Sequence, residues 1–193
     1  MQQLNSDLIG FNRLVRIIVH CLFFGIVSCV QSKKSNRITY YQTPDLTEMP
    51  DSIFKNKSVK VLDFAPGWVM INNVSYEAQT SVNHRITVVP ETICQLSKLE
   101  VLNLANNDVK NLPDCFYKLK KLKELDLSYN ESFNIDTFLS KVNKLKGLKK
   151  LNLFGIPAVA KDTNLVRSKI NLKNISLILT KHDLLNNVKL DHF

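Results

Sequence analysis

Residues 99–107 read LEVLNLANN, and residues 122–130 read LKELDLSYN. Both stretches fit the pattern L-x-x-L-x-L-x-x-N. Within each stretch the second and third leucines alternate with other residues, so a strand with its two-residue period turns them to the same side. One such strand cannot enclose its own leucines. The spacing therefore predicts that successive strands stack side by side and share one core.

This pattern is the signature of the leucine-rich repeat, and the chain resembles the 23-residue repeat class of bacterial and Ras-adaptor leucine-rich repeat proteins. The resemblance covers about residues 46–157. It implies an α/β fold, namely a short solenoid with a concave parallel β-sheet and convex 3₁₀ or α segments. It also implies a ladder at Asn107 and Asn130, in which each side-chain amide bonds the backbone of the neighbouring repeat.

Further repeats are found on both sides of this pair. A third clear strand is expected at 148–153, and a strand-like segment at 59–64 opens the array. Segments in which proline precedes an acidic residue suit the first turn of a short convex helix. They lie at 49–53, 89–93 and 112–116. The interval before the third strand is longer than the one before it, so the convex segment at about 136–145 is expected to be α-helical rather than 3₁₀.

One interval breaks the rhythm, because the distance in sequence from Val59 to Leu99 is nearly twice that of one repeat. The extra stretch, about residues 66–87, is either a degenerate short repeat or a loop inserted into the solenoid. It contains the single tryptophan, Trp68, and places His84 where a ladder asparagine would stand. A tryptophan here fits a core or capping role as well as a binding role.

The pattern changes again after Pro157. A helix is expected at about 162–169, with Asp162 or Thr163 as its N-cap, followed by a strand at 175–179. A helix followed by a final strand resembles the C-terminal cap of bacterial repeat proteins, which covers the last open strand edge. The leucine-rich repeat domain is thus expected over 37–180, with the cap at about 158–180 and a polar tail at 181–193.

The segment 1–28 resembles the signal peptide of a bacterial lipoprotein. Two arginines precede an apolar run at 17–27, which is too short to span a bilayer but fits a signal-peptide core. The run ends in IVSC, which resembles the lipobox before a lipid-modified cysteine. We therefore expect a signal peptide at 1–28, lipid attachment at Cys29 and a polar tether at 29–36. The alternatives are an uncleaved membrane anchor and an apolar N-terminal helix of a cytoplasmic protein.

Composition excludes several classes of function. The chain carries a net charge of +9, but no aromatic residues are interleaved in stacking positions and no nucleic-acid motif occurs, so no nucleic-acid partner is expected. No catalytic motif, metal-ligand spacing or phosphate-binding glycine loop is present, so neither an enzyme nor a cofactor is expected. Cys94 and Cys115 lie two positions out of register on successive convex segments, which favours two ordinary thiols.

The remaining function is recognition of a protein or peptide, for which the concave strand face is the default surface. By strand register, the side chains on that face are those between and beyond the inward leucines. They are Asp63, Val101, Asn103, Glu124, Asp126, Ser128, Lys150, Asn152 and Phe154. We expect a monomeric lipoprotein of the bacterial cell envelope that binds a protein there. The alternatives are a cytoplasmic repeat scaffold in signalling and a structural spacer without a ligand.

Overall fold

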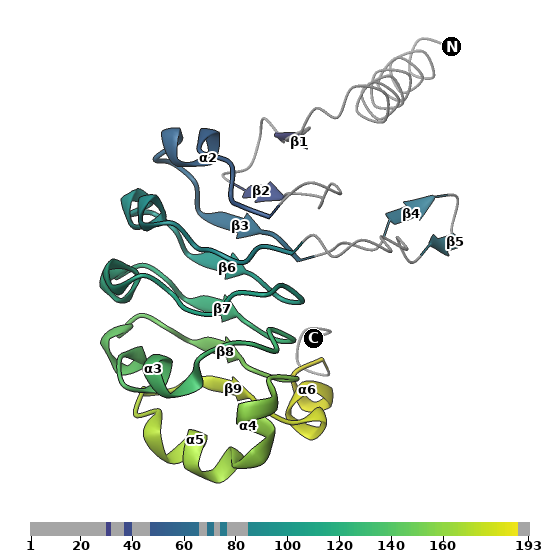
Figure 1. Cartoon of the computed structure of the whole chain (residues 1–193), viewed down its shortest axis with the longest axis vertical. Helices are drawn as coiled ribbons and strands as arrows, with labels where there is room; N and C mark the ends of the chain where they lie inside the picture. The colour runs from purple at the N-terminus through teal and green to yellow at the C-terminus, as the bar shows by residue number, and fades with distance from the viewer. Residues whose placement is uncertain are drawn as a thin grey trace. The chain divides into compact units, whose positions relative to one another are not determined.

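The computed structural model describes residues 30–31, 37–39, 47–65, 69–71, 74–76 and 85–188. Apart from Val30, these residues belong to one compact unit, Gln31–Phe193. The main sheet has seven strands in the order β1-β2-β3-β6-β7-β8-β9, and pairing from β2 to β9 is parallel throughout (Figure 1). The strands are β1 Val30–Gln31, β2 Arg37–Thr39, β3 Val61–Asp63, β6 Val101–Asn103, β7 Glu124–Asp126, β8 Lys150–Asn152 and β9 Ser176–Ile178.

The leucine pattern produces these strands. The central leucines of β3, β6, β7 and β8 are direct neighbours across the sheet, and each is at most 1% exposed. They are Leu62, Leu102, Leu125 and Leu151. Their flanking residues alternate to the other face, as the two-residue period requires. The expected α/β solenoid of leucine-rich repeats is therefore confirmed, with one continuous core beneath the sheet.

Short helices return the chain along the convex side. They are α2 Ser52–Lys55, the 3₁₀ helices η1 Glu91–Gln95 and η2 Asp114–Lys118, then α3 Ile135–Leu139 and the 3₁₀ helix η3 Val142–Lys144. Pro90 and Pro113 are the N-caps of η1 and η2, and the acidic residue after each begins the helix. The expectation of a wholly α-helical segment at 136–145 is wrong, because only its first half is α-helical. Asn134 caps that half by accepting from the Thr137 backbone N–H at 3.0 Å.

A disulfide joins Cys94 to Cys115, with 5.8 Å between the two Cα atoms. The expectation of two free thiols is therefore wrong. Equivalent residues of two stacked helices point the same way, so they do not face each other. In a 3₁₀ helix, two residues rotate the side chain by about 240°. The two-position offset that argued against pairing is thus what turns the sulfur of η2 toward that of η1.

The asparagines that follow β6 and β7 are completely buried and bonded. Asn107 accepts from the Ile86 backbone N–H at 2.9 Å and donates to Phe64 O at 3.3 Å and to Leu104 O of its own repeat at 3.1 Å. Asn130 accepts from the Val109 N–H and donates to Leu104 O, both at 2.9 Å. Each side chain therefore bonds the backbone of the preceding repeat and satisfies groups that the core would otherwise leave unpaired.

The irregular interval contains a hairpin of its own. Strands β4 (Val69–Ile71) and β5 (Val74–Tyr76) pair antiparallel as a separate two-stranded sheet. Strands β3 and β6 meanwhile pair directly with each other, which leaves no place between them in the main sheet for a strand from the interval. Trp68 and His84 lie outside the described residues.

The C-terminal cap consists of α4 Pro157–Lys161, α5 Thr163–Lys169 and β9. The expected helix and final strand are both present, and Asp162 caps α5 by accepting from the Leu165 N–H at 2.8 Å. The structure differs from the expected tail, because Lys181–Val188 forms helix α6. Thr180 and Asp183 make a reciprocal capping box at its start, with each side chain accepting from the other's backbone N–H.

The expected signal peptide, Cys29 and most of the tether lie outside the described residues. Among the helices that the structure does describe, none is long and apolar enough to cross a bilayer.

Candidate functional site

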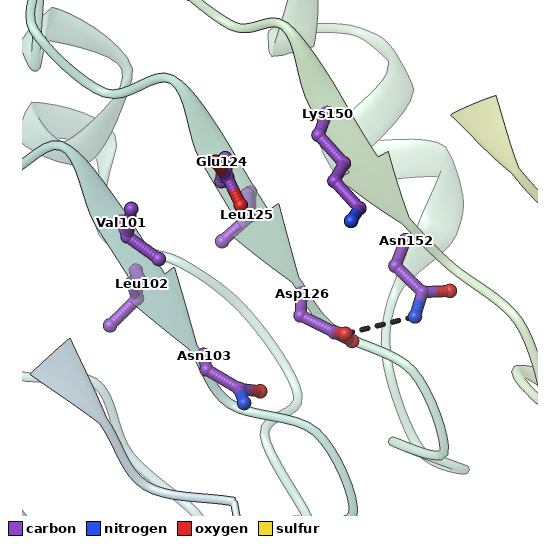
Figure 2. A pocket seen from close by; sticks show the side chains of 8 residues that line it. All are labelled: Val101, Leu102, Asn103, Glu124, Leu125, Asp126, Lys150 and Asn152. Atoms are coloured by element: carbon purple, nitrogen blue, oxygen red, sulfur yellow. Dashed lines mark hydrogen bonds between the residues drawn. The ribbon is translucent and has the colours of Figure 1, made fainter. Parts of the chain in front are cut away.

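The concave face of β6, β7 and β8 brings together most of the residues predicted for binding. Each strand contributes one residue before its buried leucine and one after it (Figure 2). We call the residues before the leucines the first row and those after them the second row. The first row is Val101, Glu124 and Lys150, and the second row is Asn103, Asp126 and Asn152. Together with Leu102 and Leu125 they line a shallow hollow in the sheet.

The second row is largely committed to the fold. Asp126 Oδ1 accepts from the Ser128 N–H at 2.9 Å, and Asn103 Oδ1 accepts from the Ala105 N–H at 3.0 Å. Asn152 follows the same rule and also donates to Asp126 Oδ2 at 2.9 Å, the contact drawn in Figure 2. Such bonds to the backbone two residues on are Asx turns, which end each strand and start the loop. The polar column is therefore a set of strand caps before it is a contact surface.

Three of the predicted contact residues do not line the hollow. Asp63 lies on β3 and makes the equivalent Asx turn, with Ala65 N at 3.3 Å. Ser128 is buried and donates its hydroxyl to Asp126 Oδ1 at 2.6 Å, so it presents almost no surface to a partner. Phe154 lies two residues beyond β8, where its ring meets Tyr129.

Tyr129 is a functional candidate that the sequence reading missed. Its ring is packed edge-to-face with that of Phe154, with centroids 5.4 Å apart, yet Tyr129 remains 49% exposed. Its φ of 56° is left-handed, which is unusual for a bulky residue. The equivalent positions of the flanking repeats hold Asn106 and Gly155, also at positive φ. The repeat register could have identified Tyr129 from the sequence, because this tyrosine occupies a loop position that favours asparagine or glycine.

The charges on the concave strands are mixed. Glu124 of the first row is exposed and lies beside Lys150 in the strand register, while Asp126 adds a carboxylate in the second row. Just before the strands begin, Glu100 lies between Lys123 at 2.5 Å and Lys60 at 2.9 Å. Hydrogen bonds from these two ammonium groups lower the pKa of Glu100 to about 2.

Helix α6 ends the concave face at the last strand. The Ser176 hydroxyl of β9 donates to Asn187 Oδ1 of α6 at 2.6 Å, and Ile178 is buried on the side where a concave residue would otherwise be open. The open part of the face thus lies on the strands before β9. Within the described part of the chain, no group of three or more metal-binding side chains is present.

A family model described as leucine rich repeat matches residues 82–131, which contain η1, β6, η2 and β7. No curated protein matches the sequence. Among solved structures, a leucine-rich repeat protein of Leptospira interrogans is 23% identical with a TM-score of 0.43, over 70% of this chain and 29% of that one. An internalin of Listeria monocytogenes is 18% identical with a TM-score of 0.34, over 50% of this chain and 33% of that one. This chain therefore spans a third or less of the length of each of these two proteins.

Proposed function

We propose that this protein is a recognition module that binds a protein or peptide segment on the concave face of β6, β7 and β8. Leucine-rich repeat folds commonly serve protein–protein interaction, because the stacked strands offer an extended concave surface. The first row supplies an apolar, an acidic and a basic side chain in sequence across three strands. These side chains can orient a partner chain by apolar and charged contacts. The residues of the hollow include no nucleophile paired with a general base.

The observation that carries this proposal is the Tyr129–Phe154 pair. A bulky residue held at positive φ is strained, and strain of this kind concentrates at functional sites. The Tyr129 ring packs between Phe154 and Gly155, where the missing Cβ leaves room for it. An aromatic ring that is already ordered loses little entropy on binding, which is why such residues anchor interfaces.

A site-specific crosslink tests the concave site. A photoreactive phenylalanine analogue replaces Glu124 in the first row, and in a control protein it replaces the exposed Lys173 of the cap. The proposal predicts a discrete adduct in producing cells from position 124 only. The adduct must also disappear in a Tyr129→Asn background, which keeps a residue suited to positive φ and removes the ring. Equal labelling from both positions, or an adduct indifferent to Tyr129→Asn, would favour a spacer without a dedicated ligand.

We also propose that the module is lipid-anchored at Cys29 in a bacterial cell envelope. The sequence at 1–29 supports this, as does the Cys94–Cys115 disulfide. Stable disulfides form in oxidising compartments and are rare in the cytosol. A cytoplasmic scaffold, the alternative, would keep both cysteines reduced.

Two measurements on protein from its own cells separate these locations. The proposal predicts an intact mass that lacks residues 1–28 and includes an added lipid. It also predicts that Cys29→Ala abolishes both changes. When cells are treated with an alkylating reagent before lysis, Cys94 and Cys115 are expected to remain unmodified until a reductant is added. A full-length, unmodified chain with two reactive thiols would overturn the envelope assignment and leave the cytoplasmic scaffold.

A further inference from the structure

The net positive charge of this protein comes from one feature of the solenoid. Four six-residue segments lead from the end of a convex helix into the start of a strand, at 55–60, 95–100, 118–123 and 144–149. They contain eleven lysines and a single acidic residue, Glu100, so they carry +10, whereas the whole chain carries +9. Everything outside them sums to a charge of −1. We call these four segments the basic edge.

The repeat register aligns the segments along one side of the sheet. Their last residues are joined by backbone hydrogen bonds, from Glu100 N to Lys60 O at 2.7 Å, then Lys123 N to Glu100 O at 2.8 Å. The next step, Lys149 N to Lys123 O, is 2.7 Å. Strands β3, β6, β7 and β8, into which the four segments lead, all begin on this side, beside the stacked convex helices (Figure 1). Neighbouring segments therefore repeat at the spacing of strands, about 4.8 Å.

Burial sorts the side chains within each segment. The apolar residues point into the core, and those directly preceding the last residue of each segment are at most 1% exposed. They are Val59, Leu99, Leu122 and Leu148. All eleven lysines are exposed: Lys55, Lys57, Lys60, Lys98, Lys118, Lys120, Lys121, Lys123, Lys144, Lys146 and Lys149. The single acidic residue of the edge, Glu100, forms its ion pairs with Lys60 and Lys123.

The chemistry of the basic edge points to one kind of partner. It contains no arginine and no aromatic residue, so it lacks the planar groups that bind phosphates bidentately or stack on bases. Nucleic acid is also scarce where the Cys94–Cys115 disulfide would persist. A row of hydrated ammonium groups instead suits a surface of many negative charges without fixed geometry, as anionic lipid headgroups present.

We propose that the basic edge docks the solenoid on an anionic lipid bilayer. The lysines lie at the beginnings of the strands, whereas the first row, Tyr129 and Phe154 lie on the concave strands and the loops that follow them. Docking through the edge therefore leaves the concave face open to a protein partner. The attraction acts with or without lipid attachment at Cys29, and it orients the module as well as holding it.

Vesicle sedimentation of the full-length, oxidised protein tests this inference. Vesicles contain neutral phosphatidylcholine alone or mixed with phosphatidylglycerol, and the readout is the ratio of the two partition coefficients at low salt. That ratio cancels any apolar contribution from other segments. The edge variant is Lys118→Gln, Lys120→Gln, Lys121→Gln and Lys146→Gln. The control variant removes the same charge from exposed lysines of the cap and α6: Lys161→Gln, Lys169→Gln, Lys173→Gln and Lys181→Gln.

Each lysine near an anionic surface strengthens partitioning roughly fivefold, so the edge variant is expected to lose about 100-fold or more of the ratio. The control variant should stay within about threefold of the wild type, and 0.5 M salt should abolish the preference because the Debye length falls to a few ångströms. Equal losses in both variants would overturn the proposal. So would an unchanged ratio in the edge variant, or tighter binding of duplex DNA than of the anionic vesicles at the same salt.

Discussion

Replacing Asn130 by alanine is expected to destabilise the domain more than any exposed substitution. The side chain is completely buried between two repeats. Its amide donates to Leu104 O and Leu127 O, both at 2.9 Å, and to Ser128 O at 3.3 Å, and its carbonyl accepts from the Val109 N–H at 2.9 Å. Alanine removes all four hydrogen bonds at once, and the site is too enclosed for bulk water to replace them.

The magnitude follows from the groups left behind. A buried backbone group that loses its partner costs about 1–3 kcal/mol. The Val109 N–H bears the full penalty, while the three carbonyls bear less because an oxygen retains a second lone pair. The expected loss of unfolding free energy is therefore about 3–5 kcal/mol for Asn130→Ala, a large share of the 5–15 kcal/mol typical of a domain.

Urea denaturation followed by circular dichroism measures this loss. Asn111→Ala is the matched control, because Asn111 is exposed on the preceding repeat, and it should change the unfolding free energy by less than about 0.5 kcal/mol. Asn130→Asp separates bonding from packing: it keeps the volume but directs a carboxylate at carbonyl oxygens, so it should be at least as harmful as alanine. An alanine variant as stable as the Asn111→Ala control, or an aspartate variant more stable than the alanine variant, would refute the reasoning.

Three further outcomes follow from the structure. Reducing Cys94–Cys115, or replacing both by serine, should lower the unfolding free energy by about 3 kcal/mol in the urea assay, since the bond closes a loop of about 20 residues. Burial alone would raise the pKa of Asp183, but the Leu179 N–H and the Arg167 guanidinium outweigh it and the pKa is lowered. Its bonds therefore stabilise α6 above about pH 4 and are lost as the pH falls through the folded value, so the protection of the α6 amides relative to intrinsic exchange should fall in acid, and Asp183→Asn should remove that pH dependence. Gly155→Ala should cost about 1–3 kcal/mol by thermal unfolding, because φ is +77° and a Cβ would lie 2.6 Å from the Tyr129 ring.

Most of the fold was predictable because leucine spacing and strand geometry carry the same information. The alternation within each strand and the constant length of the repeat leave one arrangement for Leu102 and Leu125, and the structure has it. The helix–strand cap was predictable for a similar reason, since Asp162 is a local N-cap signal. Helix α6 was overlooked, although Thr180 and Asp183 have the spacing of a capping box.

The site was less predictable, because its features depend on rotation and backbone conformation. The disulfide was judged from linear alignment of η1 with η2, whereas the helical rotation between their positions decides whether two sulfurs face each other. The concave polar column was identified, but its role in ending strands through Asx turns depends on a backbone N–H two residues away. The repeat register sets Tyr129 apart from Asn106 and Gly155, but its strained φ and its contact with Phe154 come only from the structure.

The Cys94–Cys115 bond has a mechanical consequence for the solenoid. Each repeat contacts only its neighbours, so a solenoid under tension separates at one interface between repeats at a time. We call each such interface a joint. The bond spans the joint between η1 and η2, whose turns continue into β6 and β7, the strands that carry much of the hollow. Pulling on the two ends of the chain must therefore open other joints before this one, and the arrangement of β6 beside β7 persists under load.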